Sequence, residues 1–427
     1  MSHTLFLARA ALVFACSIAC VRAYSEAIEP AAKSEGFSIE RLNHINATLK
    51  RDVASARLPG AVLLAARNGK LVLADVVGVQ DPQANIPMRR DSIFRIYSMT
   101  KPIVSVAVMM MVEEGRVLLG DPISRYIPEL KDLNVGVEKM DADGTTKLDL
   151  VPANREMIVY DLLRHTAGLT YGFEGKSLVK DEYKRLNLDG AALSGGEWLS
   201  NLVKAPLQSQ PGSNWEYSIA TDVLGVLLER VSARTLDVYL AERLFKPLGM
   251  KDTAFWVEPP KQARIANAFA IDPVFKVSTT LTDVRQPPAR FSGGGGLVST
   301  ADDYLRFAQM LLNGGELDGV RILAPNTVAF MLADQLAGIR AKLPPGTAPP
   351  GPRPGYSFGL GVAIRNELGD SITLGNAGIA DWNGIAGTNF WIDPKENLAA
   401  VWMAQAPGLR PYYRQLIPNM IYGAMVR

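Results

Sequence analysis

The pattern of apolar and polar positions predicts a helix followed by a hairpin near the N-terminal end. In residues 38–54, apolar side chains recur at spacings of three and four, which is typical of a helix with one buried face. Two apolar runs, 61–67 and 70–77, then flank Asn68 and Gly69. An Asn-Gly pair between apolar runs is the strongest short hairpin signal, so we expect two antiparallel strands here.

A second hairpin and a helix are predicted at the other end of the chain. The apolar runs 388–392 and 398–403 flank the turn-forming segment 393–397. The last stretch, 412–426, is predicted to be helical, with a kink at Pro418.

The middle of the chain has a different character. Residues 123–286 are mainly helical and loop-rich by pattern, with helices expected at 159–163 and 222–231. The simplest architecture is an α/β lobe built from 37–122 and 287–427, with the helical lobe 123–286 inserted. In the α/β lobe we expect an antiparallel sheet flanked by helices.

Composition and charge narrow the range of functions that the chain could have. The chain has 427 residues, 48% of them hydrophobic and 21% charged, which is enough apolar mass for a large core. The formal net charge is only +2, from 45 basic and 43 acidic residues, so nucleic acid is not an expected partner.

The N-terminus has the pattern of a secretory signal peptide, residues 1–23. An apolar run, 10–20, follows a basic residue and precedes a small-residue cleavage site at 21–23. The run is too short to span a bilayer, so we expect a periplasmic or secreted protein without stable membrane insertion. A lipoprotein signal at Cys20 is the less favoured alternative, because a serine replaces the usual leucine three residues earlier. Since Cys16 and Cys20 both lie in this segment, the mature chain would have no thiol for catalysis.

The most informative chemical feature is the stretch from Ser98 to Lys101. It opens an apolar run, 102–112, that is predicted to be a helix. Positions three apart share a helix face, so one turn can carry a nucleophilic serine and a lysine that activates it. A second match to this spacing, from Ser177 to Lys180, lies in a charged stretch and is predicted to be surface.

Other serine-hydrolase patterns do not fit the chain. Residues 355–359 match Gly-x-Ser-x-Gly, but a triad built on Ser357 needs a histidine later in the chain. The three histidines, His3, His44 and His165, all precede it. We therefore expect Ser357 to begin a strand, and His165 to be a structural loop residue rather than a catalytic base.

Two glycine-containing segments receive structural interpretations. Gly293 to Gly296 has no Gly-Lys-Ser/Thr continuation, so it is not a phosphate loop; we expect it to permit close backbone approach. Ser299 or Thr300 should cap the helix that follows. Residues 141–144 lack the remainder of a calcium loop and are predicted to form a turn.

Two further segments offer groups that a serine nucleophile needs. Tyr217 precedes a predicted helix, and a tyrosine at such a junction can act as a base if cations lower its pKa. Taken alone, an ordinary half-buried tyrosine is the better interpretation. Residues 375–388 form a glycine-rich stretch before the last hairpin, where a strand edge can offer a backbone N–H to a carbonyl oxygen.

Together these segments resemble the serine β-lactamase and penicillin-binding-protein superfamily over nearly all the mature chain. Ser98 and Lys101 match the first motif of that superfamily, Tyr217 matches the tyrosine of the second, and Trp382-Asn383-Gly384 occupies the place of the third. Two landmark segments agree with the resemblance: 163–169 and 295–302. It implies a β-lactamase/transpeptidase-like fold.

Two departures shift the expected activity. Ile219 replaces the amide of the second motif, and Trp382 replaces the lysine of the third, which attracts a β-lactam carboxylate. A third motif with tryptophan and glycine, and a second motif of the form Tyr-Ser-x-x-x-Asp-Val-Leu-Gly at 217–225, are similar to those of the family VIII carboxylesterases and related acyltransferases. The resemblance therefore implies a serine esterase that acts on small-molecule esters, with no metal or organic cofactor.

The resemblance also implies a role for each residue. Ser98 would form the acyl-enzyme, while Lys101 and Tyr217 carry the proton. The N–H groups of Ser98 and Ile385 would form the oxyanion hole, and substrate would be bound by Trp382, Asn383 and Gly384. The alternatives are acyl transfer, a peptidase, an amide hydrolase or weak β-lactamase of the same fold, and a non-catalytic cell-envelope binding protein. The sequence does not define the oligomeric state.

Overall fold

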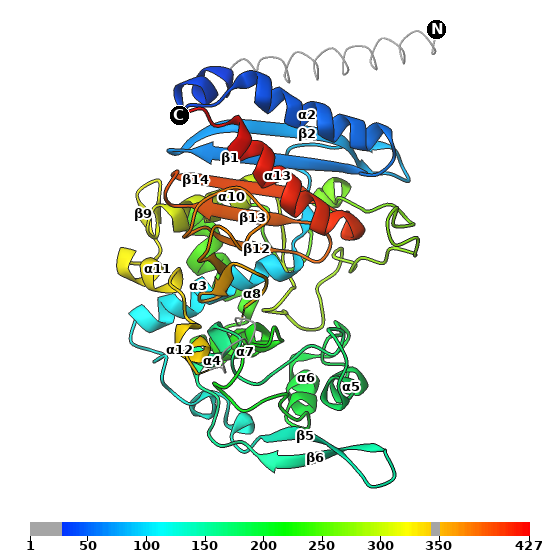
Figure 1. Cartoon of the computed structure of the whole chain (residues 1–427), viewed down its shortest axis with the longest axis vertical. Coiled ribbons are helices and arrows are strands. Elements are labelled where there is room, and N and C mark those ends of the chain that lie inside the picture. The colour runs from blue at the N-terminus through cyan, green and yellow to red at the C-terminus, as the bar shows by residue number, and fades with distance from the viewer. Residues whose placement is uncertain (1–27, 343–350) are drawn as a thin grey trace.

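The two ends of the chain share one large sheet. The computed structural model describes residues 28–342 and 351–427; the predicted signal peptide lies outside the described residues. Among these residues an antiparallel sheet has eight strands, which are stacked in the upper half of Figure 1. Their order across the sheet is β10 (Tyr356–Phe358), β11 (Ala363–Arg365), β12 (Ala380–Asn383), β13 (Asn389–Asp393), β14 (Leu398–Ala404), β1 (Gly60–Arg67), β2 (Lys70–Asp81) and β3 (Ile86–Pro87).

Both predicted hairpins are confirmed. Asn68 and Gly69 join β1 to β2, with φ of 52° and 75°, and Arg67 pairs with Lys70. Positive φ at both turn residues matches the right-handed twist of the strands, which explains the Asn-Gly pair. β13 and β14 form the second hairpin. β14 also pairs with β1, and this pairing joins the strands from the two ends of the chain into one sheet.

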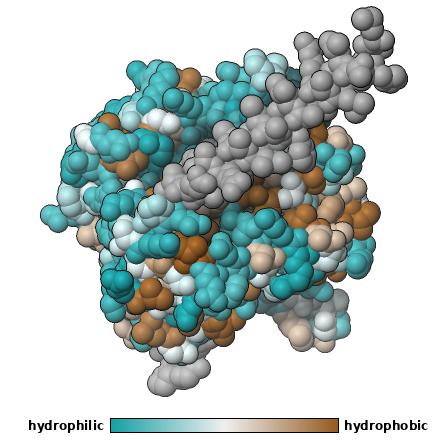
Figure 2. Space-filling model, turned by 90° about the horizontal axis from the view of Figure 1, so that it is seen from above, coloured by the Kyte–Doolittle hydropathy of each residue, from teal (hydrophilic) through white to brown (hydrophobic). Residues whose placement is uncertain are grey.

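Helices cover both faces of the sheet. α2 (Ile39–Ala54) and α13 (Arg410–Ala424) lie on one face, with Pro418 inside α13 as predicted. The Ser38 side chain accepts a hydrogen bond from the Arg41 N–H and so begins α2. Seen from this end of the molecule, hydrophilic residues surround several separate hydrophobic groups (Figure 2).

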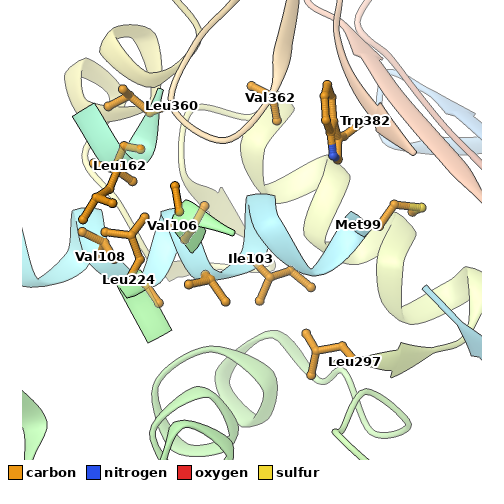
Figure 3. Close-up of a cluster of buried hydrophobic side chains, with 14 of the residues drawn as sticks. Met99, Ile103, Val106, Val108, Leu162, Leu224, Leu297, Leu360, Val362 and Trp382 are labelled. Atoms are coloured by element: carbon orange, nitrogen blue, oxygen red, sulfur yellow. The ribbon is translucent and has the colours of Figure 1, made fainter. Parts of the chain in front are cut away.

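The opposite face packs on α10 (Ala301–Leu312) and, beyond it, on α3 (Thr100–Glu113). The Thr300 side chain caps α10, one of the two caps that the sequence offered. Every residue of α3 from Thr100 to Met111 is buried, because this helix passes between the sheet and the helical lobe (Figure 3). A helix that is apolar on all sides belongs in the interior, which is what its sequence predicts.

The helical lobe lies below the sheet in Figure 1. Its helices are α4 (Val159–Leu163), α5 (Leu178–Arg185), α6 (Gly195–Leu202), α7 (Ala220–Ser232), α8 (Leu236–Leu240) and α9 (Lys246–Leu248). Shorter elements complete the fold: β4 (Phe94–Arg95), β7 (Val298–Ser299), β8 (Glu316–Leu317), β9 (Val320–Arg321), α11 (Pro325–Met331) and α12 (Ala337–Arg340). No helix in the described part of the chain is long and apolar enough to cross a membrane.

One hairpin in this lobe was not predicted. β5 (Asn134–Met140) and β6 (Thr146–Pro152) pair along their whole length, and most of their side chains are exposed. Because this ribbon buries little apolar surface, its hydrophobic pattern is weak. The segment from Asp141 to Gly144 forms the turn that was expected there, and the Asp141 N–H donates to the Thr145 carbonyl over 2.8 Å.

Candidate active site

Ser98 lies at the junction of a short strand and the central helix. β4 pairs with β7 just before a 3₁₀ turn, Tyr97–Met99, which runs directly into α3. Tyr97 has φ of 41°, an uncommon value for a residue with a side chain, which costs about 1–3 kcal/mol. Its hydroxyl accepts a hydrogen bond of 3.0 Å from the Thr282 N–H, which helps to fix the turn. The turn leaves Ser98 half-buried, whereas Lys101, one helical turn later, is fully buried.

Lys101 connects three segments of the chain. Its Nζ lies 2.6 Å from the Gly294 carbonyl oxygen, 2.9 Å from the Tyr171 hydroxyl and 3.4 Å from Ser98 Oγ. Three neighbours equal the three donors of an ammonium group. A neutral amine instead has two N–H donors and a lone pair. Two donors can then serve Gly294 and Tyr171 while the lone pair faces Ser98.

Glycine is required at position 294 because a side chain would collide there. A Cβ atom on Gly294 would lie 2.2 Å from Asp222 Oδ2. Asp222 accepts hydrogen bonds from Arg290 (2.7 Å) and Ser292 (2.6 Å). Burial acts to raise the pKa of Asp222, but Arg290 and Ser292 outweigh it and lower that pKa overall. The expected close backbone approach at this glycine run is confirmed.

Tyr217 lies over Lys101. Lys101 Nζ is 4.8 Å from the centre of the Tyr217 ring, within range of a cation–π interaction. The Tyr217 hydroxyl is buried and finds no hydrogen-bond partner among the described residues. A phenol without a structural partner is available for proton transfer.

Tyr171 is a site residue that the sequence reasoning missed. It comes two residues after the landmark segment 163–169, and its hydroxyl contacts Lys101. Burial, and then the neighbouring Tyr217 and Asp222, raise the pKa of Tyr171 well above its ordinary value. Tyr171 therefore stays neutral and serves as a fixed hydrogen-bond acceptor for Lys101. An aromatic residue directly after the landmark is the only signal that marks it.

His165 packs against the ring of Tyr217. Its ring lies 4.9 Å from the Tyr217 ring, and its Nδ1 is 3.1 Å from Ser218 Oγ. Burial, and then Lys101, lower the pKa of His165 well below its ordinary value, so the ring is neutral. These contacts fit the structural role that the sequence predicted.

The two alternative serines have structural partners. Ser177 caps α5 by accepting a hydrogen bond of 3.1 Å from the Lys180 N–H, and it donates to Gln208 over 2.7 Å. Ser357 is buried in β10, where a strand was expected, and donates to Asp334. Neither serine has the lysine contact that Ser98 makes.

The side chains at the third motif point to opposite faces of β12. Trp382 lies above the start of α3 (Figure 3), with its ring 5.3 Å from that of Tyr217. Asn383 pairs with Asn389 in the sheet and is adjacent to Trp382, so its side chain points to the other face. Asn383 is one of the three residues predicted to bind substrate, but its side chain does not point toward Ser98.

Gly384 and Ile385 form the turn that follows β12. A Cβ atom on Gly384 would lie 2.4 Å from the Ile96 carbonyl oxygen, two residues before Ser98. The glycine therefore lets this turn pack directly against the segment that leads into Ser98. The Ile385 N–H has no acceptor among the described residues, and its side chain is 46% exposed.

A cavity of about 270 Å³ opens beside Ser98. Ile219, the residue in place of the second-motif amide, is buried in its wall. Phe173, Phe255 and Ile385 add apolar surface, while Asp189 and Asp283 contribute carboxylates. Within residues 28–342 and 351–427, no cluster of three His, Cys, Asp or Glu residues could hold a metal ion.

Comparisons with known proteins agree with this geometry. The Beta-lactamase family model matches residues 45–422. The chain is 38% identical to Protein Rv1367c of Mycobacterium tuberculosis (strain ATCC 25618 / H37Rv) over 362 residues, which cover 83% of this chain and 88% of that one. It is 32% identical to Esterase EstB of Burkholderia gladioli over 372 residues, which cover 82% and 86%.

A solved structure extends the match to the whole fold. EstCE1, described as a hydrolase with promiscuous acyltransferase activity, has a TM-score of 0.73 at 27% identity, covering 92% of this chain and 100% of that one. The chain therefore belongs to the β-lactamase family, and the predicted β-lactamase/transpeptidase-like fold is confirmed. The protein is a serine hydrolase or acyltransferase of that fold.

Replacing Gly384 with alanine should disturb Ser98 from a distance. The added Cβ meets a backbone oxygen, so the 3₁₀ turn or the β12 turn must move. We expect the rate at which a fluorophosphonate probe labels Ser98 to fall about 10- to 100-fold, because small misplacements of reacting groups are costly. The matched control is Gly369→Ala, whose Cβ would meet nothing within 4 Å. Equal labelling rates in the two variants would contradict the packing argument.

Proposed function

We propose that this protein is a serine esterase that hydrolyses short-chain or small-molecule carboxylic esters through an acyl-enzyme. The observation that carries the proposal is the 3.4 Å contact between Ser98 Oγ and a fully buried Lys101 whose other partners are fixed. This distance is long for a hydrogen bond, as is common in catalytic pairs before substrate binds. The similarity to Esterase EstB and to EstCE1, a hydrolase with promiscuous acyltransferase activity, supports the same reaction class.

In the proposed reaction, Ser98 Oγ attacks the ester carbonyl carbon and its proton passes to Lys101 or Tyr217. The tetrahedral intermediate collapses, and the leaving alkoxide takes a proton, for which Tyr217 is the favoured donor. Ser98 is left acylated. Water or an acceptor alcohol then attacks the acyl carbon and restores the serine hydroxyl, so hydrolysis and acyl transfer share one intermediate.

The backbone N–H groups of Ser98 and Ile385 would stabilise the developing oxyanion. The Ile385 turn is closed by other groups: the Gly384 N–H donates to Thr388, and the Gly387 N–H donates to Gly384. The Ile385 N–H is left without a partner in the described residues, at the cavity that Ser98 also lines. A fixed donor aimed at developing charge lowers the barrier without any reorganisation at the moment of reaction.

The walls of the cavity favour neutral substrates. Ile219 and Ile385 contribute apolar surface, and the Asp189 and Asp283 carboxylates would repel a substrate carboxylate. The two arginines of the lining already have partners: Arg290 is paired with Asp222, and Arg95 donates to the Thr282 and Ala266 carbonyls. Burying a carboxylate against an apolar wall without a partner is costly. A neutral ester carries no such penalty.

Replacing Ser98 with alanine should abolish ester turnover, a loss of several orders of magnitude. The hydroxyl makes only the long Lys101 contact, so thermal stability should change little. Ser357→Ala and Ser177→Ala are the controls and should keep most activity, although Ser177→Ala removes a helix cap worth about 1 kcal/mol. Mass spectrometry of phosphonate-treated protein locates the modified serine. Modification of Ser177 or Ser357 in place of Ser98 would overturn the assignment.

Replacing Tyr217 with phenylalanine, or Lys101 with alanine, should each lower kcat by about two to four orders of magnitude. Tyr217→Phe is the cleaner test, because the hydroxyl it removes has no structural partner among the described residues. The matched control is Tyr239→Phe, which deletes another buried, unpartnered hydroxyl in α8. Steady-state kinetics and melting temperatures should show that only Tyr217→Phe loses activity. Near-normal rates in both Tyr217→Phe and Lys101→Ala would contradict the lysine–tyrosine mechanism and make His165 the candidate base.

Neutral esters should be turned over faster than β-lactams. The comparison is kcat/KM for nitrophenyl butyrate against kcat/KM for nitrocefin, measured on one preparation. We expect the ester value to be higher, because the lysine that attracts a β-lactam carboxylate is replaced by Trp382. A higher value for nitrocefin would favour a true β-lactamase. No turnover of either compound by folded protein would favour a non-catalytic binding protein.

A further inference from the structure

A second cavity, of about 280 Å³, lies against the face of the sheet that α13 covers. Its lining includes Asp381 from β12, Trp391 from β13 and Arg414 from α13. Asp381 pairs with Trp391 in the sheet, and Trp391 packs in the hydrophobic cluster beneath α2 and α13. Trp382, the next residue after Asp381, belongs to the cluster around α3. The sheet therefore separates this cavity from Ser98.

The rim of the cavity is apolar and exposed. Ile372 and Leu374, in the loop between β11 and β12, are 76% and 53% exposed, although both are large hydrophobic residues. Pro411 and Pro418 of α13 line the facing side. Apolar side chains grouped at the mouth of a cavity, rather than scattered singly, mark a binding surface.

The charged groups of the cavity do not balance. Arg353 forms an ion pair with Asp381. Arg414 has no hydrogen bond or ion pair with any residue that the structure describes. Burial, and then repulsion from Arg353, lower the pKa of Arg414 to about 10. The remaining carboxylate in the lining, Asp370, is exposed to solvent at the rim. Arg414, which is half-buried, is thus left without an ion-pair partner among the described residues.

Two further polar atoms in the lining lack partners. Asp381 Oδ1 and Arg353 Nη1 are buried and have no hydrogen-bond partner among the described residues. Asp381 itself is only 6% exposed. Buried polar atoms are nearly always paired in folded proteins, so the unpaired Arg353 Nη1 donor beside a cavity points to a ligand that accepts a hydrogen bond. Asp381 Oδ1 is an acceptor, and a ligand of that kind would not pair with it.

We propose that this cavity binds an amphiphilic monocarboxylic acid. The carboxylate would accept hydrogen bonds from Arg414 and balance its charge, while the apolar chain covers Ile372 and Leu374. A neutral or cationic amphiphile would leave the half-buried Arg414 charge without a partner, which is the less favourable arrangement. The site is distinct from the serine centre, and the inference does not rest on the esterase reaction.

The test is calorimetric titration of octanoate into protein whose active-site serine has been blocked with a phosphonate. We expect one octanoate per chain, with 1-octanol and octylammonium bound at least about tenfold more weakly, a difference of one well-formed charged contact. Arg414→Gln should weaken octanoate binding by at least about tenfold as well. The matched control is Arg410→Gln, one turn earlier on α13, which does not line the cavity and should bind octanoate like the wild type.

Three results would overturn the proposal: equal affinity for octanoate and 1-octanol, unchanged binding in Arg414→Gln, or loss of binding when the serine is blocked. A second variant covers the case in which Arg414→Gln does not fold. Ile372→Asp places a carboxylate at an exposed rim position, where the fold should tolerate it. It should also lower octanoate affinity about tenfold or more, because it replaces an apolar contact with a like charge.

Discussion

The burial of Lys101 is the constraint on which the rest of the site depends. A fully buried lysine is stable only if its N–H donors are satisfied, since a lost partner leaves a polar or charged group in the core. The two close acceptors, Gly294 and Tyr171, come from segments 193 and 70 residues away in sequence. Satisfying the Lys101 N–H donors therefore requires the segments of Lys101, Tyr171 and Gly294 to lie together. Because the 3₁₀ turn that carries Ser98 runs directly into the helix of Lys101, the same contacts also position Ser98, the proposed nucleophile.

Close backbone approach is the second requirement, and two glycines provide it. Gly294 lets the segment before β7 reach both Lys101 and Asp222, and Gly384 lets the β12 turn touch the Ile96 carbonyl. Neither contact leaves room for a Cβ atom. The sheet and the α10 layer hold these segments together. The site is therefore a product of packing between distant segments, and a single motif defines only one side of it.

The parts of this structure that local rules govern were predictable from the sequence. The Asn68–Gly69 turn and the Thr300 cap follow from backbone preferences of a few consecutive residues. The Ser98 and Lys101 pair follows from helical spacing together with the apolar run that comes after it. Tyr171 could not be found this way, because its contact with Lys101 joins residues that are 70 positions apart in the chain. Hydrophobic periodicity carries no information about such long-range contacts, and it is silent for the exposed β5–β6 ribbon.

The strand β12 shows why a motif read as consecutive letters misleads. Consecutive residues of a strand point to opposite faces, so Trp382 and Asp381 have unrelated surroundings. Trp382 lies with Tyr217 near Ser98, where an indole favours apolar groups over carboxylates. Asp381 lies with Arg353 in a cavity beneath α13, and the half-buried Arg414 also lines this cavity. Under the two proposals made above, a carboxylate is disfavoured on the face that carries Ser98 and favoured on the other, and one strand separates these two electrostatic environments.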